Sequence, residues 1–181
     1  HKDEWAQQAL QAFKQANNMT ERMHALQALV AINHALATDA LALFYQQFRK
    51  EELVLDKWFA AQAAASDHEG HVLSRVRQLM QHPDFQIRNP NRARSRIASY
   101  CNNPAAFHRT DASGYVFWSE RVLELDSFNP QVAARLARAM DRWRKLVEPY
   151  RSAAHEAIRR VAAKDDLSAD VREVIDSALE D

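Results

Sequence analysis

Hydrophobic side chains recur every three to four residues along almost the whole chain, which is the spacing of one face of an α-helix. No segment shows the strict alternation of apolar and polar residues that is typical of a half-buried strand. Only a few residues separate most of the helical segments, and short connections force neighbouring helices to be antiparallel. The helical segments that the pattern predicts cover residues 5–16, 20–36, 38–48, 53–65, 71–81, 91–102, 114–125, 129–146, 149–161 and 168–179.

Polar residues mark several of the expected helix starts. A Ser, Thr or Asn side chain accepts a hydrogen bond from the first turn, an acidic residue there suits the helix dipole, and Pro fits the first helical position. We therefore expect the second helix to continue through Asn33 to Leu36 from a cap at Thr20. The expected start signals are Thr20-Glu21, Thr38-Asp39, Asn129-Pro130, Pro149 and Ser168.

Two stretches interrupt the pattern. Residues 82–90 are flanked by Pro83 and Pro90, and residues 104–113 form the longest expected loop. The chain has only 2 glycines in 181 residues, far fewer than the turns of an all-β protein require. We predict one all-α domain over residues 1–181, an array of about ten helices in antiparallel hairpins that forms a HEAT/armadillo-like α-solenoid. A compact irregular helical bundle is the alternative.

Charge and composition exclude several classes of function. The 24 basic residues balance the 24 acidic ones, so we expect no general attraction to nucleic acid or to an anionic membrane. No apolar run approaches the roughly 20 residues of a membrane span. The single Cys101 cannot form an internal disulfide, which fits a reducing, cytoplasmic location. Because the chain begins at His1 rather than Met, we expect it to be a fragment of a longer polypeptide.

Two histidine motifs approach the zinc-binding pattern His-Glu-x-x-His without completing it. His68 and His71 are one residue too close together, and Gly70 between them favours a loop or a helix start. His155 is followed by a glutamate, but the second ligand position holds the cation Arg159, so an exposed helix face with paired charges is the better interpretation. We expect no metal site in this chain.

Nucleophilic catalysis has no better support. The sequence lacks a Gly-x-Ser-x-Gly elbow and a glycine-rich phosphate loop. Cys101 stands beside apolar residues, where a lone cysteine usually serves packing. We expect no catalytic residue in this chain.

Four arginines gather within nine residues, and such a cluster could hold phosphates, carboxylates or RNA. Cations at a helix N-terminus oppose its dipole, which indicates that some of them have acidic partners, such as Asp84 or Asp111. The alternative is a solvated helix start. The cluster consists of Arg88, Arg92, Arg94 and Arg96.

Five short motifs together resemble the C-terminal helical domain of bacterial aminopeptidase N, a zinc-dependent peptidase. The resemblance extends over nearly the whole chain. The motifs are specific, because helix formation alone does not require these sequences. The motifs are residues 53–59 (LVLDKWF), 89–95 (NPNRARS), 103–108 (NPAAFH), 111–115 (DASGY) and 129–133 (NPQVA).

The resemblance implies a non-catalytic role for this chain. In the family, a zinc-activated water removes N-terminal amino acids from peptides, and the zinc ligands lie in an upstream domain. The C-terminal domain closes over that domain and limits access to the active-site chamber. The implied partners are the upstream catalytic domain and peptide substrates, and no cofactor is implied for this chain itself.

The resemblance also singles out individual residues. Arg94 in residues 89–95 and Arg135 after residues 129–133 match residues that face the chamber, and Gln131 is expected beside Arg135 on the same helix face. A guanidinium group suits this place because it offers a planar fork of donors to the carboxylate at the end of a peptide. The alternative is that both arginines form ordinary salt bridges within the array.

Two other functions are compatible with the same pattern. A free-standing helical-repeat scaffold would bind a protein partner on its concave face. An RNA-binding helical domain would use the cluster from Arg88 to Arg96, although the neutral net charge argues against it.

Overall fold

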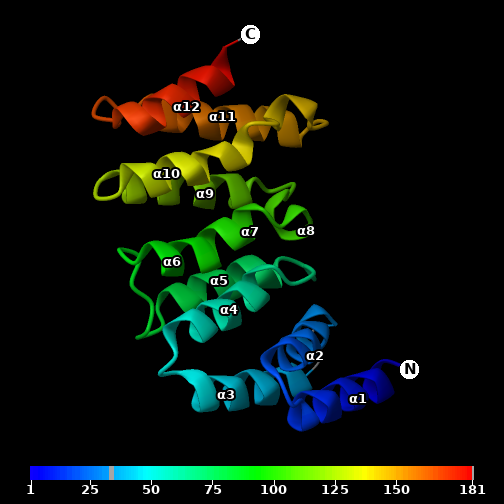
Figure 1. The fold of residues 1–181 in the computed structure, drawn as a ribbon. Coiled ribbons are helices and arrows are strands. Elements are labelled where there is room, and N and C mark those ends of the chain that lie inside the picture. Colours follow the sequence, from blue (N-terminus) through cyan, green and yellow to red (C-terminus); the bar gives the residue numbers. More distant parts are fainter. Residues whose placement is uncertain (33–34, 181) are drawn as a thin grey trace.

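The structure, a computed structural model, describes residues 1–32 and 35–180, and every regular element in this part of the chain is helical. The helices stack in pairs from the N-terminal to the C-terminal end of an elongated molecule (Figure 1). The elements are α1 (Lys2–Gln15), α2 (Met19–Ala31), α3 (Leu36–Phe48), α4 (Glu52–Ala63), α5 (His71–Met80), α6 (Pro90–Ala93), the π-helical turn η1 (Arg94–Ala98), α7 (Ser99–Cys101), α8 (Pro104–Phe107), α9 (Ser113–Asp126), α10 (Pro130–Ala137), the 3₁₀ turns η2 (Arg138–Met140) and η3 (Trp143–Lys145), α11 (Tyr150–Ala162) and α12 (Ala169–Leu179).

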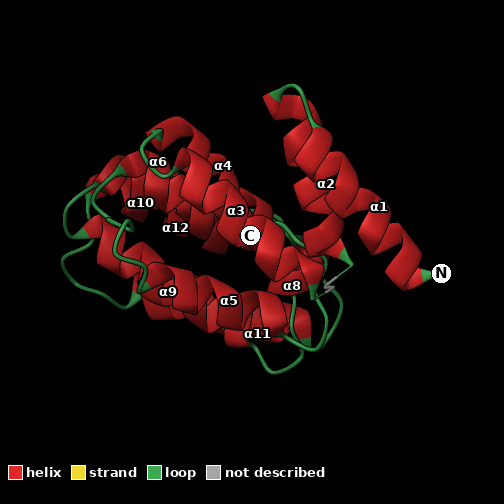
Figure 2. Ribbon diagram, turned by 90° about the horizontal axis from the view of Figure 1, so that it is seen from below, coloured by secondary structure: helices red, strands yellow, loops and turns green. Residues whose placement is uncertain are grey.

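The stack has two layers, which Figure 2 shows end-on. One layer contains α4, the helix formed by α6, η1 and α7, then α10 and α12; the other contains α5, α9 and α11. The N-terminal helices α1 and α2 lie to one side of these two layers. The prediction of an all-α, ARM-like array of helical hairpins is confirmed, and the elongated stack replaces the compact-bundle alternative.

One continuous hydrophobic core runs from α1 to α12, and from α4 onward it lies between the two layers. Three indole N–H groups join neighbouring elements of the stack to one another, because a buried donor needs an acceptor. The accepting carbonyl lies on a different helix or turn from the tryptophan in every case. These bonds join Trp58 Nε1 to the Leu41 carbonyl at 3.0 Å, Trp118 Nε1 to that of Leu136 at 3.0 Å and Trp143 Nε1 to that of Ala178 at 2.9 Å.

The second helix begins earlier than the cap signal at Thr20 predicts. The N-cap is Asn18, whose side chain accepts a hydrogen bond from the Glu21 N–H at 2.9 Å. Glu21 lies in the first turn, as expected. The helix ends at Ala31, so its predicted continuation to residue 36 is wrong, and Asn33 lies outside the described residues.

The third helix likewise begins before its expected cap at Thr38. Leu36, assigned by its apolar spacing to the preceding helix, is the first residue of α3. The residue before it, Ala35, has helical backbone angles and offers no side-chain cap. Asp39 lies in the first turn, where a carboxylate favours the helix dipole. A polar residue inside the first turn was therefore mistaken for the cap.

The expected loop over residues 104–113 contains a helical turn. Pro104 occupies the first position of α8, which runs to Phe107. Proline is suited to this position because its missing N–H would have no partner there. The loop prediction is wrong for these four residues.

The expected helix over residues 129–146 is broken into three pieces. Asn129 caps α10 by accepting from the Val132 N–H at 3.2 Å, as predicted. Beyond Ala137 the chain continues in the 3₁₀ turns η2 and η3. A 3₁₀ helix places residues i and i+3 on the same face, so an apolar spacing of three and four does not distinguish it from an α-helix.

No helix in residues 1–32 and 35–180 combines the length and the hydrophobicity needed to cross a membrane.

Candidate functional site

The motif at residues 89–95 builds the start of the helix that carries the arginine cluster. The Asn89 side chain accepts hydrogen bonds from the N–H groups of Asn91 at 3.0 Å and Arg92 at 3.3 Å. Pro90 takes the first helical position. These two residues fix the direction of the helix and therefore the faces on which its arginines lie.

Arg92 points into the protein. Its Nε lies 2.9 Å from Oδ1 of Asp56 on α4, and its Nη1 donates to the backbone carbonyl of Asp84 at 3.3 Å. Burial raises the pKa of Asp56, and the charge of Arg92 opposes that rise. The expected carboxylate partners were wrong, because Asp84 contributes only its backbone and Asp111 pairs with Arg109.

Arg96 is fully buried, with 0% of its surface exposed. Its guanidinium carbon lies 3.6 Å from the ring centroid of Phe59 and 4.0 Å from that of Phe85, and Nη1 donates to the Leu79 carbonyl. Burial lowers the pKa of Arg96 to about 9. This arginine holds α4, α5 and η1 together and is not available to a ligand.

The other two members of the cluster face outward. Arg88 lies over the ring of Phe128 with 4.8 Å to its centroid, and Arg94 donates to Oδ1 of Asn91 at 2.9 Å. Because two of the four arginines are internal, the cluster is not a continuous basic surface. The interpretation as an RNA-binding patch loses its main support.

Arg94 and Arg135 line the same small cavity, of about 60 Å³, which we call the Arg94–Arg135 groove. It lies between η1 and α10, and Ile97, Leu125 and Val132 form its apolar floor. Both arginines are exposed. Arg135 forms no ion pair within residues 1–32 and 35–180, so the salt-bridge alternative is not supported for this residue.

Gln131 lies one turn before Arg135 on α10 and is exposed. It does not line the Arg94–Arg135 groove.

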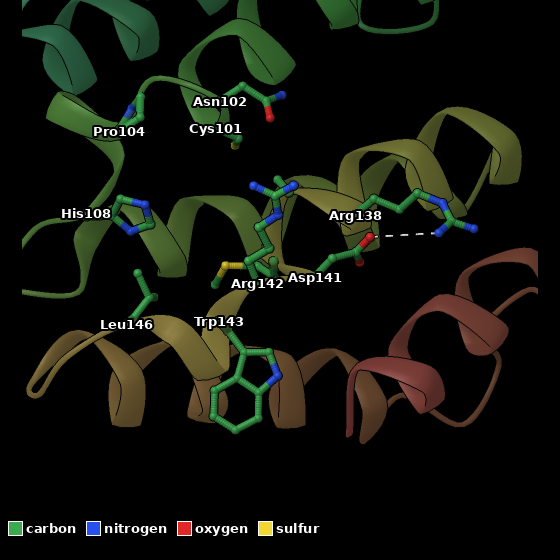
Figure 3. A pocket seen from close by; sticks show the side chains of 11 residues that line it. Cys101, Asn102, Pro104, His108, Arg138, Asp141, Arg142, Trp143 and Leu146 are labelled. Carbon is green, nitrogen blue, oxygen red and sulfur yellow. Dashed lines mark ion pairs between the residues drawn. The ribbon is translucent and has the colours of Figure 1, made fainter. Parts of the chain in front are cut away.

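A second cavity of about 400 Å³ lies between the end of α7, α8 and the turns η2 and η3 (Figure 3). We call it the Arg142 cavity. Figure 3 shows the side chain of Arg142 reaching toward Cys101 and Asn102, whereas Arg138 lies to one side and pairs with Asp141 at 3.8 Å. This cavity was not predicted from the sequence. The basic series Arg135, Arg138 and Arg142 shows that cations recur in this segment, but it does not indicate that they line a cavity.

His108 stands at the other side of the Arg142 cavity. Its Nδ1 lies 2.7 Å from the Tyr115 hydroxyl, and burial lowers the pKa of its imidazole. Cys101 forms part of the wall and is 4% exposed. Burial raises the pKa of the thiol well above its usual range, which keeps it protonated and unreactive. The prediction that Cys101 serves packing is confirmed.

The histidine motifs have structural roles. Gly70 has a φ of +83° at the N-cap of α5, so His71 begins a helix and His68 precedes it, as predicted. His155 is not on a simple exposed face, because its ring stacks on Trp143 with 4.9 Å between centroids. In the part of the chain that the structure describes, no three His, Cys, Asp or Glu side chains cluster as metal ligands would.

Comparison with known proteins assigns the fold to a family. Residues 1–180 match the family described as "Domain of unknown function (DUF3458_C) ARM repeats". Over 168 residues, the chain is 39% identical to aminopeptidase N of Caulobacter vibrioides and 38% identical to that of Escherichia coli, in each case over 92% of this chain. The chain therefore belongs to the C-terminal helical domain family of aminopeptidase N.

A solved structure of Legionella pneumophila aminopeptidase A, in complex with aspartic acid, has the same arrangement of helices. The TM-score is 0.89 at 30% sequence identity, and the match covers 96% of this chain. The chain spans about a fifth of the length of its relatives, with 19% of each aminopeptidase N and 20% of the Legionella chain covered.

Proposed function

We propose that this chain is the non-catalytic C-terminal domain of a zinc aminopeptidase that releases N-terminal amino acids from peptides. The domain closes the active-site chamber and controls the access of peptides to it. The family assignment supports the attachment to an upstream catalytic domain, and packing of this chain against that domain is part of the proposal. A cytoplasmic location is part of the same proposal, supported by the single buried thiol of Cys101.

The described residues do not fit a zinc ion, because no suitable cluster of ligands lies within them. We therefore place the zinc of the complete enzyme in the upstream domain and assign no step of the zinc chemistry to this chain. The contribution of this chain is to bind and orient the peptide.

One observation carries this proposal: Arg94 and Arg135 come from successive hairpins and line one groove. Two exposed guanidinium groups over an apolar floor suit a peptide terminus, because they offer paired donors to its carboxylate. The apolar floor accommodates a side chain of the same peptide. Such a groove would hold the far end of a substrate whose N-terminus lies at the zinc.

The test uses the natural polypeptide that contains this chain, with Arg94→Ala and Arg135→Ala. A tripeptide should lose about tenfold in kcat/KM, the scale of one charge-assisted hydrogen bond, while a single-residue amide substrate keeps its rate. Arg151→Ala is the matched control, since Arg151 is an exposed arginine on α11 paired with Glu148 at 3.0 Å. Equal losses for both substrates, or no loss for either, would contradict the proposed role.

A further inference from the structure

The Arg94–Arg135 groove and the Arg142 cavity are lined by consecutive stretches of the same two segments. Residues 90–98 and 132–136 line the first, and residues 101–104 and 138–142 contribute to the second. The two segments lie next to each other in one layer of the stack and run in the same direction (Figure 1). The groove and the cavity therefore follow one another along this layer.

The two sites lie within reach of a short extended peptide. Arg142 is seven positions after Arg135, and α10 ends between them at Ala137, so at roughly 1.5–2.0 Å per helical or 3₁₀ residue this segment spans at most about 10–14 Å. An extended peptide advances about 3.3 Å per residue. The cavity thus lies within roughly three to four peptide residues of the groove.

Arg142 is the cation that this cavity offers to a ligand. Arg142 is exposed, and its side chain has neither an ion pair nor a hydrogen bond to any residue in 1–32 or 35–180. Its side chain reaches across the cavity toward Asn102 (Figure 3). Arg138, by contrast, is paired with Asp141 at 3.8 Å.

Asn102 adds a hydrogen-bond acceptor. Its Nδ2 donates to the Ala98 carbonyl at 2.8 Å, which leaves Oδ1 to accept from a ligand. A backbone N–H of a bound peptide can donate to this oxygen, and Arg142 can donate to the carboxylate of the same peptide. Asn102 and Arg142 together therefore match the last residue of a peptide, which carries both a backbone N–H and a carboxylate.

The rest of the wall is mixed. Pro104, Leu146 and the buried Met140 line the cavity, as do His108 and the ion pair of Arg138 with Asp141 at 3.8 Å. Pro104 and Leu146 lie on the side of His108, away from that ion pair (Figure 3), and there they offer apolar contact to a side chain.

We propose that the Arg142 cavity binds the C-terminal residue of a longer peptide, with its carboxylate on Arg142 and its apolar side chain against Pro104 and Leu146. This site rests on the proposed function, since it extends the same peptide path. It selects peptides roughly three to four residues longer than those whose carboxylate lies in the Arg94–Arg135 groove.

The test uses Arg142→Gln in the natural polypeptide and two hexapeptides that end in phenylalanine, one with a free carboxylate and one with an amide. KM for the acid should rise about tenfold, KM for the amide should change less than twofold, and a tripeptide acid should be unaffected. Arg151→Gln serves as the control. An equal change for acid and amide, or no change, would overturn the proposed site.

A second variant tests the apolar wall independently of the charge. Leu146→Ala should reduce the preference for a C-terminal phenylalanine over a C-terminal alanine by several-fold in hexapeptides. An unchanged preference would also overturn the site. If Arg142→Gln has no effect while Arg94→Ala still impairs tripeptides, the proposed function stands and the second site fails.

Discussion

The Asn103 side chain lies between α7 and the end of α4 and donates from Nδ2 to two backbone carbonyls, those of Ala63 at 3.1 Å and Ala65 at 2.7 Å. A helix leaves its last carbonyls without internal partners, and here a residue from the next hairpin supplies the donors. Asn103 is 8% exposed, so water is a poor substitute. This contact attaches the helix that carries Arg94 to the preceding hairpin.

Replacing Asn103 with alanine should lower the free energy of unfolding by about 1–3 kcal/mol, because two buried carbonyls lose their partner. Urea denaturation of both proteins measures the change. Asn17→Ala, at an exposed position, should stay within about 0.5 kcal/mol of the parent. Equal effects of the two substitutions would show that the Asn103 contact contributes nothing.

Gly114→Ala should destabilise the protein more than Gly70→Ala. A Cβ at position 114 would lie 2.1 Å from the backbone oxygen of Phe107, which can move only if α8 shifts. At position 70 the nearest atoms belong to the flexible side chain of Arg109, and the left-handed backbone costs an alanine only about 1–2 kcal/mol. Thermal unfolding of the two variants gives the order, and the reverse order would contradict this packing argument.

Asp56→Asn should be strongly destabilising, by roughly 3–5 kcal/mol, the range for a buried ion pair that loses one partner. The side chains of Arg92 and Asp56 are only 7% and 15% exposed, so the cation would remain buried without a counter-charge. Glu52→Gln, at an exposed position of the same helix, provides the control. Similar unfolding midpoints for the two variants would rule out a structural role for this pair.

The protein should lose stability as the pH falls below about 6.5. Burial lowers the pKa of both His82 and His108, so the unfolded chain binds protons in a range in which the folded chain does not. Their contribution is complete above pH 6.5 and declines until the folded-state pKa is reached. Urea denaturation between pH 7.5 and 5.5 should show this decline, and His82→Gln with His108→Gln should weaken it. An unchanged decline in that double variant would assign the effect to other groups.

Much of the fold could be predicted because hydrophobic spacing and helix capping are local signals. Asn89, Asn129 and Ser168 cap helices through contacts within three residues of themselves. The end of α2 at Ala31 and the change to 3₁₀ turns after Ala137 could not be predicted, since tertiary packing decides where a helix tightens or ends.

The candidate site was predictable only in part. Helical spacing separates Arg94 from Arg92 and Arg96, because two residues correspond to about 200° around a helix. It does not reveal which of these faces turns inward. That choice depends on Asp56 and Phe59 of α4, more than 30 residues away in the sequence.

The resemblance to a known family identified Arg94 and Arg135, but not Arg142. The cavity around Arg142 exists because the chain leaves α10 through two 3₁₀ turns. No local motif in the sequence predicts that change of direction.

The central claim, that the Arg94–Arg135 groove holds the carboxylate of a bound peptide, is tested most directly by one ratio. This ratio is kcat/KM for a tripeptide with a free carboxylate divided by kcat/KM for the same tripeptide as its amide. In the natural polypeptide that contains this chain, Arg94→Ala with Arg135→Ala should lower the ratio at least about tenfold. A ratio that stays the same in the double variant would contradict the claim.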